Sequence, residues 1–198
     1  MILVPMLLPA LGLSAWLTSL RVSDARAELE SRGERESRYL ADASELALLV
    51  ADSETLQRLV PHLDAHGADR QAREAAVAVM RYFDTAAHHH HEDEELDLFP
   101  ALLESMAGSD AVCLRELTAA LATDHRALEA GWRRLRRVLE PVAAGAAVTL
   151  AADEVQAFVG LYDRHIAREE AELLPMAARL LDAATLDRLG LAMRTRRG

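Results

Sequence analysis

The sequence twice places a histidine four residues before a glutamate, and this pairing can bind a metal ion. His90 precedes Glu94, and His165 precedes Glu169. On an α-helix, residues with this spacing project from the same face, so each pair presents one imidazole and one carboxylate to the same point. Two such pairs facing each other in a helical core would supply the nitrogen and oxygen donors that iron, manganese or zinc accepts, rather than those that calcium prefers.

The two pairs belong to an internal repeat. The segment HHEDEELDLFP, which begins at His90, aligns without a gap with HIAREEAELLP, which begins at His165, and both end in proline, at Pro100 and Pro175. A single histidine–glutamate pair is more often a solvated ion pair on a helix surface. Its repetition at the same place in both halves favours a shared site on a pseudo-twofold axis between two helical hairpins.

Other histidines extend the candidate site. A run of four, residues 88–91, lies inside a helical pattern, and for this run alone a solvated helix face or adventitious metal binding remains an alternative. His125 lies on the same helical face as Leu121, Leu128 and Trp132. A lone histidine on an apolar face is usually a core residue, but the repeated pairs offer His125 a metal site to join.

The elements that must position these residues are predicted to be helices. Ala and Leu dominate the composition, and Pro and Gly are sparse, which indicates an all-α fold. We expect an up-down-up-down four-helix bundle with a pseudo-twofold internal repeat, plus a short C-terminal helix and an N-terminal extension. The expected helices run from about Ser44 to Leu63 with a bend near Pro61, from Asp69 to Pro100, from Asp110 to Glu140 ending before Pro141, from Leu150 to Leu181 with a kink near Pro175, and from Thr185 to Met193.

Composition excludes several classes of function. The 22 basic and 32 acidic residues give a net charge of -10. This charge argues against binding to nucleic acid or to anionic membrane surfaces. Every basic residue is arginine, so a Schiff-base or Walker-type lysine mechanism is excluded. The single cysteine, Cys113, cannot form an internal disulfide or a cysteine-based zinc site, which favours a reducing, cytoplasmic location.

The N-terminal part differs from the rest of the chain. Residues 1–20 are apolar, but no basic residue precedes them, and Pro5 and Pro9 interrupt them. A strongly charged stretch follows. We therefore predict an N-terminal extension over residues 1–40 and a four-helix domain over residues 41–198; export or membrane tethering through the apolar segment remains an alternative.

Three segments resemble those of the hemerythrin-like domain, also called the HHE cation-binding domain. They are HHEDEELDLFP, DHRALEAGW and HIAREEAELLP, and the resemblance covers about Leu46 to Leu181. It implies a four-helix bundle with a non-haem diiron centre. Carried over by position, His90, His125 and His165 would be terminal ligands. Glu94 and Glu169 would bridge the two irons together with an oxo or hydroxo group. From the donors alone, manganese and zinc remain open.

One position departs from the family pattern. The family has a histidine in the first helix, in a segment like DHR, whereas this chain reads DSE and places Ser53 there. Serine is a poor ligand for iron(II). The best substitute is His91, next to His90, while Glu54 and His62 are weaker candidates because the helix rotates them away. A site with one metal, or none, is a further alternative.

The resemblance implies a protein that binds iron, with a role in oxygen or iron binding, storage or sensing. Its small partner would be dioxygen, another diatomic molecule or peroxide. A coordination position left open at Ser53 would instead favour an oxidoreductase that removes peroxide or nitric oxide. The third alternative is a helical interaction module whose metal site is vestigial.

Overall fold

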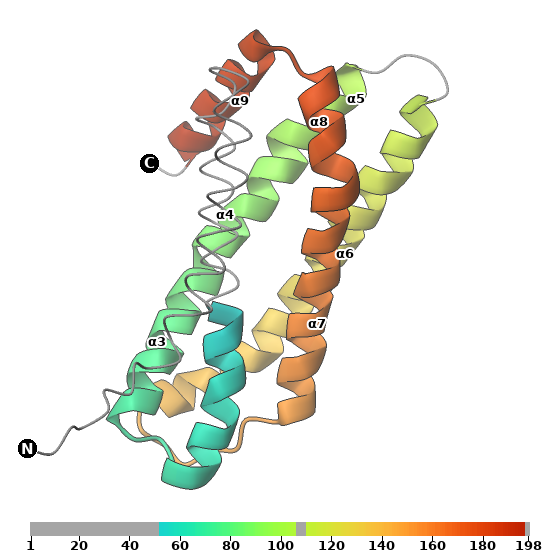
Figure 1. Cartoon of the computed structure of the whole chain (residues 1–198). Coiled ribbons are helices and arrows are strands. Elements are labelled where there is room, and N and C mark those ends of the chain that lie inside the picture. The colour runs from blue at the N-terminus through green and yellow to red at the C-terminus, as the bar shows by residue number, and fades with distance from the viewer. Residues whose placement is uncertain (1–51, 106–109, 197–198) are drawn as a thin grey trace, which may run out of the picture. The chain divides into compact units, whose positions relative to one another are not determined.

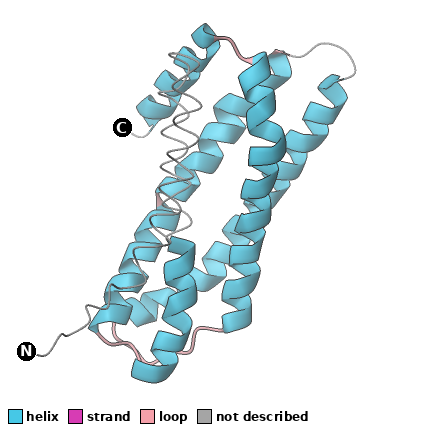
Figure 2. Cartoon of the chain, in the orientation of Figure 1, coloured by secondary structure: helices cyan, strands magenta, loops and turns pink. Residues whose placement is uncertain are grey.

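Helices joined by short loops make up the described part of the chain (Figure 2). The computed structural model describes residues 52–105 and 110–196, which lie in a compact unit, Leu49–Gly198, and contain no strand. The all-α prediction is therefore confirmed. No helix in these ranges has the length and the apolar character that a membrane span requires. The predicted N-terminal extension, with its apolar segment, lies outside the described residues.

Four helical segments run antiparallel to form the bundle, and a shorter helix follows them (Figure 1). The first segment is a helix over residues 52–66, whose predicted start near Ser44 lies outside the described residues. The second is α3 (Arg70–Asp84), α4 (Ala86–Asp93), η1 (Glu94–Leu98) and α5 (Phe99–Glu104); the third is α6 (Asp110–Ala143); the fourth is α7 (Ala152–Arg168), η2 (Glu169–Leu173) and α8 (Leu174–Leu180); and α9 (Ala183–Arg196) comes last.

The turn between the first two segments follows from its sequence. Gly67 adopts a left-handed conformation with φ of 66°, which glycine adopts without a steric cost, and its N–H donates to the carbonyl of Leu63. Asp69, where the second helix was predicted to begin, is the N-cap of α3, and its carboxylate accepts a hydrogen bond from the Ala72 N–H at 2.8 Å. This short turn makes the second segment antiparallel to the first.

The third segment continues further than the sequence predicted. We expected it to end before Pro141, but α6 includes Pro141 and ends at Ala143. The prediction was wrong because a proline in the last helical turn removes only one hydrogen bond and leaves few residues to disrupt. The N–H of Ala146 donates to the carbonyl of Pro141, and Gly145, with φ of 84°, turns the chain away.

The second segment, predicted as one continuous helix, is interrupted twice. At Thr85 the backbone leaves the helical region, and the threonine hydroxyl donates to the carbonyl of Arg81 at 2.6 Å. Further along, η1 is a π-helical turn. The Phe99 N–H donates to the carbonyl of Glu94, five residues earlier, and Pro100 follows with no N–H to donate.

The fourth segment repeats this π-helical turn at the equivalent place. In η2 the Leu174 N–H donates to the carbonyl of Glu169, and Pro175 follows. The predicted kink near Pro175 is thus a widened turn that begins six residues before the proline. The internal repeat of the sequence is therefore also a repeat of backbone geometry, and each widened turn begins at a candidate ligand.

Two apolar clusters fill the core, and a polar layer lies between them along the helices. On α6, Leu121 belongs to one cluster and Leu128 to the other, and His125 lies between them. On the fourth segment, the repeated histidine–glutamate pair likewise lies between Tyr162 of one cluster and Leu173 of the other. The polar layer is thus closed by packed apolar side chains at both ends.

Candidate metal centre

The polar layer consists of buried histidines and glutamates from three of the helical segments. His125 and His165 are each 1% exposed. The buried members are His91 on α4, Glu94 on η1, His125 on α6, His165 on α7 and Glu169 on η2. Charged side chains are almost never buried without partners, so this layer requires a compensating interaction.

The two carboxylates each turn their two oxygens toward different histidines. Glu94 places Oε2 at 3.1 Å from His125 Nε2 and Oε1 at 4.0 Å from His90 Nε2. Glu169 places Oε1 at 2.6 Å from His165 Nε2 and Oε2 at 4.0 Å from His90 Nε2. His90 therefore lies on one side of the carboxylate pair, and His125 and His165 lie on the other side.

These side chains converge closely enough to hold an ion. One donor atom from each of Glu94, His125, His165 and Glu169 lies within 4.8 Å of the others. His91 forms a second group of this kind with His125 and His165. The fold thus brings five of the six predicted site residues together in these groups, and it places His90 at their edge, beside both carboxylates.

Several buried nitrogen and oxygen atoms of the layer make no hydrogen bond with the described residues, although other nitrogen and oxygen atoms of the layer lie near them. They are His91 Nε2, His125 Nε2, His165 Nδ1, His165 Nε2 and Glu169 Oε1. Buried polar atoms without partners cost about 1–3 kcal/mol each. Nitrogen lone pairs and carboxylate oxygens that point at a common space without bonding each other are the donor set of a metal site, so the residues present fit a transition metal.

The protonation of the layer is also suited to a metal. Burial by itself raises the pKa of the Glu169 carboxyl, but the neighbouring imidazoles, His165 foremost, outweigh it and hold this pKa below its ordinary value. Burial, reinforced by the imidazoles of His125 and His90, lowers the pKa of His91 well below its ordinary value. Glu169 is therefore anionic and His91 neutral at neutral pH, and these are the forms that coordinate metals.

The position of the missing histidine is buried. The side chain of Ser53 lies in the first helical segment and is 7% exposed as a residue. His91, the expected substitute, stacks on His125 with ring centroids 4.1 Å apart, so it lies with the His125 and His165 group. The weaker candidates have other partners: Glu54 pairs with Arg58 at 3.5 Å, and His62 pairs with Asp69 at 2.9 Å.

Outer carboxylates contact the far nitrogens of two histidines, and the sequence did not identify these contacts. Glu95 Oε1 lies 2.7 Å from His125 Nδ1. Asp124 Oδ2 lies 3.8 Å from His165 Nδ1 and accepts a hydrogen bond from Arg168 at 2.5 Å. The aspartate directly before the histidine in the DHR segment was the available signal for the second contact.

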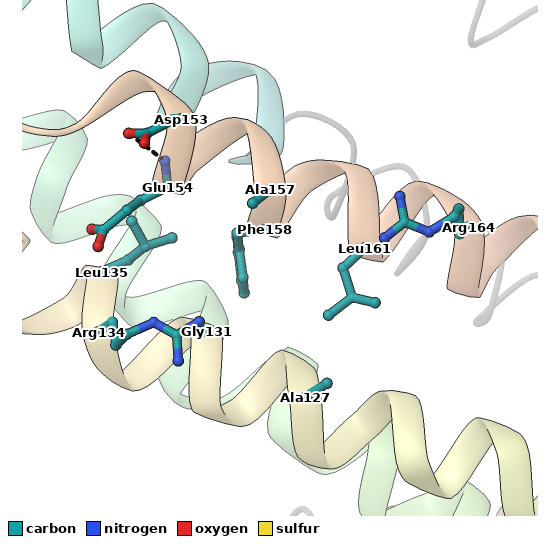
Figure 3. A pocket seen from close by; sticks show the side chains of 10 residues that line it. All are labelled: Ala127, Gly131, Arg134, Leu135, Asp153, Glu154, Ala157, Phe158, Leu161 and Arg164. Atoms are coloured by element: carbon teal, nitrogen blue, oxygen red, sulfur yellow. Dashed lines mark hydrogen bonds between the residues drawn. The ribbon is translucent and has the colours of Figure 1, made fainter.

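Of two hollows that described residues line near the bundle core, one reaches the polar layer. A groove of about 430 Å³ between α6 and α7 is lined by residues outside the polar layer, including Gly131, Phe158 and Arg164 (Figure 3). The other hollow, of about 260 Å³, has His91 in its wall, together with aromatic residues such as Phe83. This second hollow offers a small molecule an approach to the layer.

Comparisons with known proteins agree with this geometry. The sequence pattern described as the Hemerythrin HHE cation binding domain matches residues 44–177, which include the whole polar layer. An uncharacterized protein of Haemophilus influenzae is 32% identical over 142 residues, which cover 72% of this chain and 79% of that protein.

Proposed function

The chain belongs to the hemerythrin HHE cation-binding domain family, and we propose that its polar layer binds two iron ions and through them a small ligand such as dioxygen. The two iron ions would occupy the space between His90 on one side and His125 with His165 on the other. The proposed role is oxygen or iron binding, storage or sensing.

The observation that carries the proposal is the split orientation of the two carboxylates. Glu94 and Glu169 each direct one oxygen toward His90 and the other toward the opposite histidines. A carboxylate whose two oxygens face different histidines is suited to bridge two ions held by those histidines. The buried anionic carboxylate of Glu169, in the same layer as the neutral imidazole of His91, also places a negative charge in the core, and bound cations would offset that charge.

The surrounding residues determine what reaches the ions. When bound, two iron(II) ions can together supply two electrons to a small ligand. The apolar clusters on both sides of the layer exclude bulk water, and the hollow beside His91 has aromatic walls that include Phe83, Trp132 and Tyr162. The hollow also carries the charged side chains of Asp84, Glu129 and Arg133, so its limited volume is what favours a small molecule over a large metabolite.

A second candidate function is supported by Ser53. In place of an imidazole, this buried position carries a hydroxyl that is a poor ligand for iron(II). Among the described residues, the side with His90 would then offer fewer histidine donors than the side with His125 and His165. A centre with an open position suits an oxidoreductase that consumes peroxide or nitric oxide better than it suits a carrier that only binds oxygen.

Iron loading tests the proposal. The full chain is reduced and loaded with iron(II) without air, desalted, and analysed for iron per chain before and after air exposure. We expect two irons per wild-type chain and a new near-ultraviolet absorption band in air. Glu169→Gln should lose both, while Glu170→Gln, at the exposed neighbouring position, should keep both.

The further outcomes separate the candidates. A spectrum that returns when oxygen is removed supports reversible binding, and catalytic loss of added peroxide or nitric oxide supports the oxidoreductase. Retention of no iron, with an unchanged melting temperature, would overturn the proposal and leave the vestigial interaction module.

A further inference from the structure

One imidazole of the polar layer is held between two consecutive carboxylates. His125 Nε2 lies 3.1 Å from Glu94 Oε2, and His125 Nδ1 lies 2.7 Å from Glu95 Oε1. Both glutamates belong to the π-helical turn η1. From this contact we infer that Glu95 is a positioning residue, which fixes the tautomer and the ring orientation of His125 for metal binding. The inference rests on the proposed metal site.

The chemistry of the contact determines which nitrogen carries the proton. A carboxylate oxygen accepts hydrogen bonds, so in the Glu95 contact the imidazole Nδ1 is the donor. With a proton held at Nδ1, the ring can offer the Nε2 lone pair to a metal, and Nε2 points toward Glu94 and the rest of the donor group. Without Glu95, the ring of His125 could exchange tautomers or rotate, and in either state the lone pair would leave the site. Carboxylates in this outer position also raise the basicity of the metal-bound imidazole.

The other half of the repeat shows that this contact is particular to His125. Glu170, which matches Glu95 in the repeat, is exposed and forms no ion pair with a described residue. His165 Nδ1 instead has Asp124 at 3.8 Å, which is beyond hydrogen-bond distance, and Asp124 is held by Arg168. Glu95 is therefore an outer carboxylate in direct hydrogen-bond contact with a histidine of the layer, and Glu170 provides a matched control.

The burial of the pair shows why Glu95 can be changed without breaking the fold. The side chain of Glu95 is 37% exposed, whereas that of His125 is only 2% exposed. Replacing a half-exposed carboxylate leaves no uncompensated charge in the core, although His125 Nδ1 loses its acceptor. We expect Glu95→Ala to lower metal affinity about 10–100-fold, as is typical when an outer ligand of a metal-bound histidine is lost. Glu95→Gln, whose amide oxygen can still accept from Nδ1, should restore part of this loss.

The experiment has two readouts on the full chain. The affinity for cobalt(II), a redox-stable probe, is measured by competition with a fluorescent chelator for the wild type, Glu95→Ala, Glu95→Gln and Glu170→Ala. In the metal-free protein, nitrogen-15 chemical shifts report the tautomer of His125. We expect wild-type His125 to carry its proton on Nδ1, Glu95→Ala to show a mixture of tautomers, and Glu170→Ala to match the wild type in both readouts.

The outcomes distinguish a failure of this inference from a failure of the proposed site. If the wild type binds cobalt(II) and Glu95→Ala binds it within twofold of the wild type, the positioning role is wrong. If the tautomer of His125 does not change in Glu95→Ala, the role is also wrong. If the wild type binds no cobalt(II) while the tautomer shifts as expected, the proposed metal site fails and the contact between Glu95 and His125 stands.

Discussion

The buried pair His165 and Glu169 should reduce the stability of the metal-free protein, because its polar atoms are matched to an ion and not to each other. Their closest atoms lie 2.6 Å apart, and His165 Nδ1 makes no hydrogen bond with the described residues. Replacing a buried carboxylate and its partner by apolar residues of similar size often stabilises a protein by about 1–4 kcal/mol. The double variant His165→Leu/Glu169→Met should therefore be more stable than the wild type in the presence of a chelator.

Each single variant should be less stable than the wild type in the presence of a chelator. His165→Leu leaves the anionic Glu169 without its main compensating neighbour, and breaking a buried pair from one side costs about 3–5 kcal/mol. In a chain of this size, each kcal/mol shifts the melting temperature by about 2–4 °C. Urea unfolding followed by circular dichroism, with EDTA present, measures both effects. An exposed pair, Arg70 and Glu74, serves as the control, and its double replacement by glutamine should change stability by less than about 1 kcal/mol.

In the same unfolding experiment with iron(II) under anaerobic conditions, we expect the wild type to become more stable than the double variant. A ligand at one hundred times its dissociation constant stabilises the folded state by about 2.7 kcal/mol. The wild type should gain at least this much from iron(II), and the double variant should gain nothing. If the double variant is less stable than both single variants in EDTA, the pair is not a burden on the metal-free protein. If iron(II) still stabilises the double variant, the pair does not serve the metal.

Four further substitutions test other parts of the structure. The Ala72 N–H and the nearby His62 hold the pKa of Asp69 below its ordinary value. Asp69→Ala should therefore lower the melting temperature at neutral pH, and the difference should fade as the pH falls through the range in which the wild-type carboxyl is protonated. Ser53→His should increase iron retention in chelator competition and, by crowding a buried position, should cost the metal-free protein about 1–3 kcal/mol in urea unfolding. Gly131→Ala should destabilise by up to about 2 kcal/mol, because its Cβ would lie 3.0 Å from the ring of Phe158, whereas Gly160→Ala should stabilise by about 0.5–1 kcal/mol.

For each of these predictions, one result would contradict the expected role of the residue. An effect of Asp69→Ala that does not change with pH would contradict the role of the ionised cap. Unchanged iron retention in Ser53→His would mean that this position does not face the site. Equal effects at Gly131 and Gly160 would contradict the close packing of α6 against Phe158.

The parts of the site that follow helical periodicity could be predicted from the sequence. The spacing of His165 and Glu169, repeated at His90 and Glu94, indicated a shared site, and the structure brings both carboxylates beside His90. The predicted start of the second helix at Asp69 was also correct. These features depend on residues a few positions apart, so a regular helix is enough to derive them.

Features that depend on departures from the regular helix could not be derived in this way. The π-helical turns at Glu94 and Glu169 change which face the following residues present, and the continuation of α6 through Pro141 depends on the turn that follows it. The contact of Glu95 with His125 joins residues from different helices, and it depends on helix rotation and side-chain rotamers. The placement of His91 with His125 has the same origin.

X-ray absorption at the iron edge of the anaerobically loaded full chain measures whether Glu94 and Glu169 hold two metal ions side by side. We expect two irons per chain and a second iron in the scattering shell at about 3.5–4 Å from the first, the separation typical of two-metal sites. Both signals should be lost in Glu169→Gln and kept in Glu170→Gln. One iron per chain, with only light atoms around it, would show that the two carboxylates do not bridge a pair of irons.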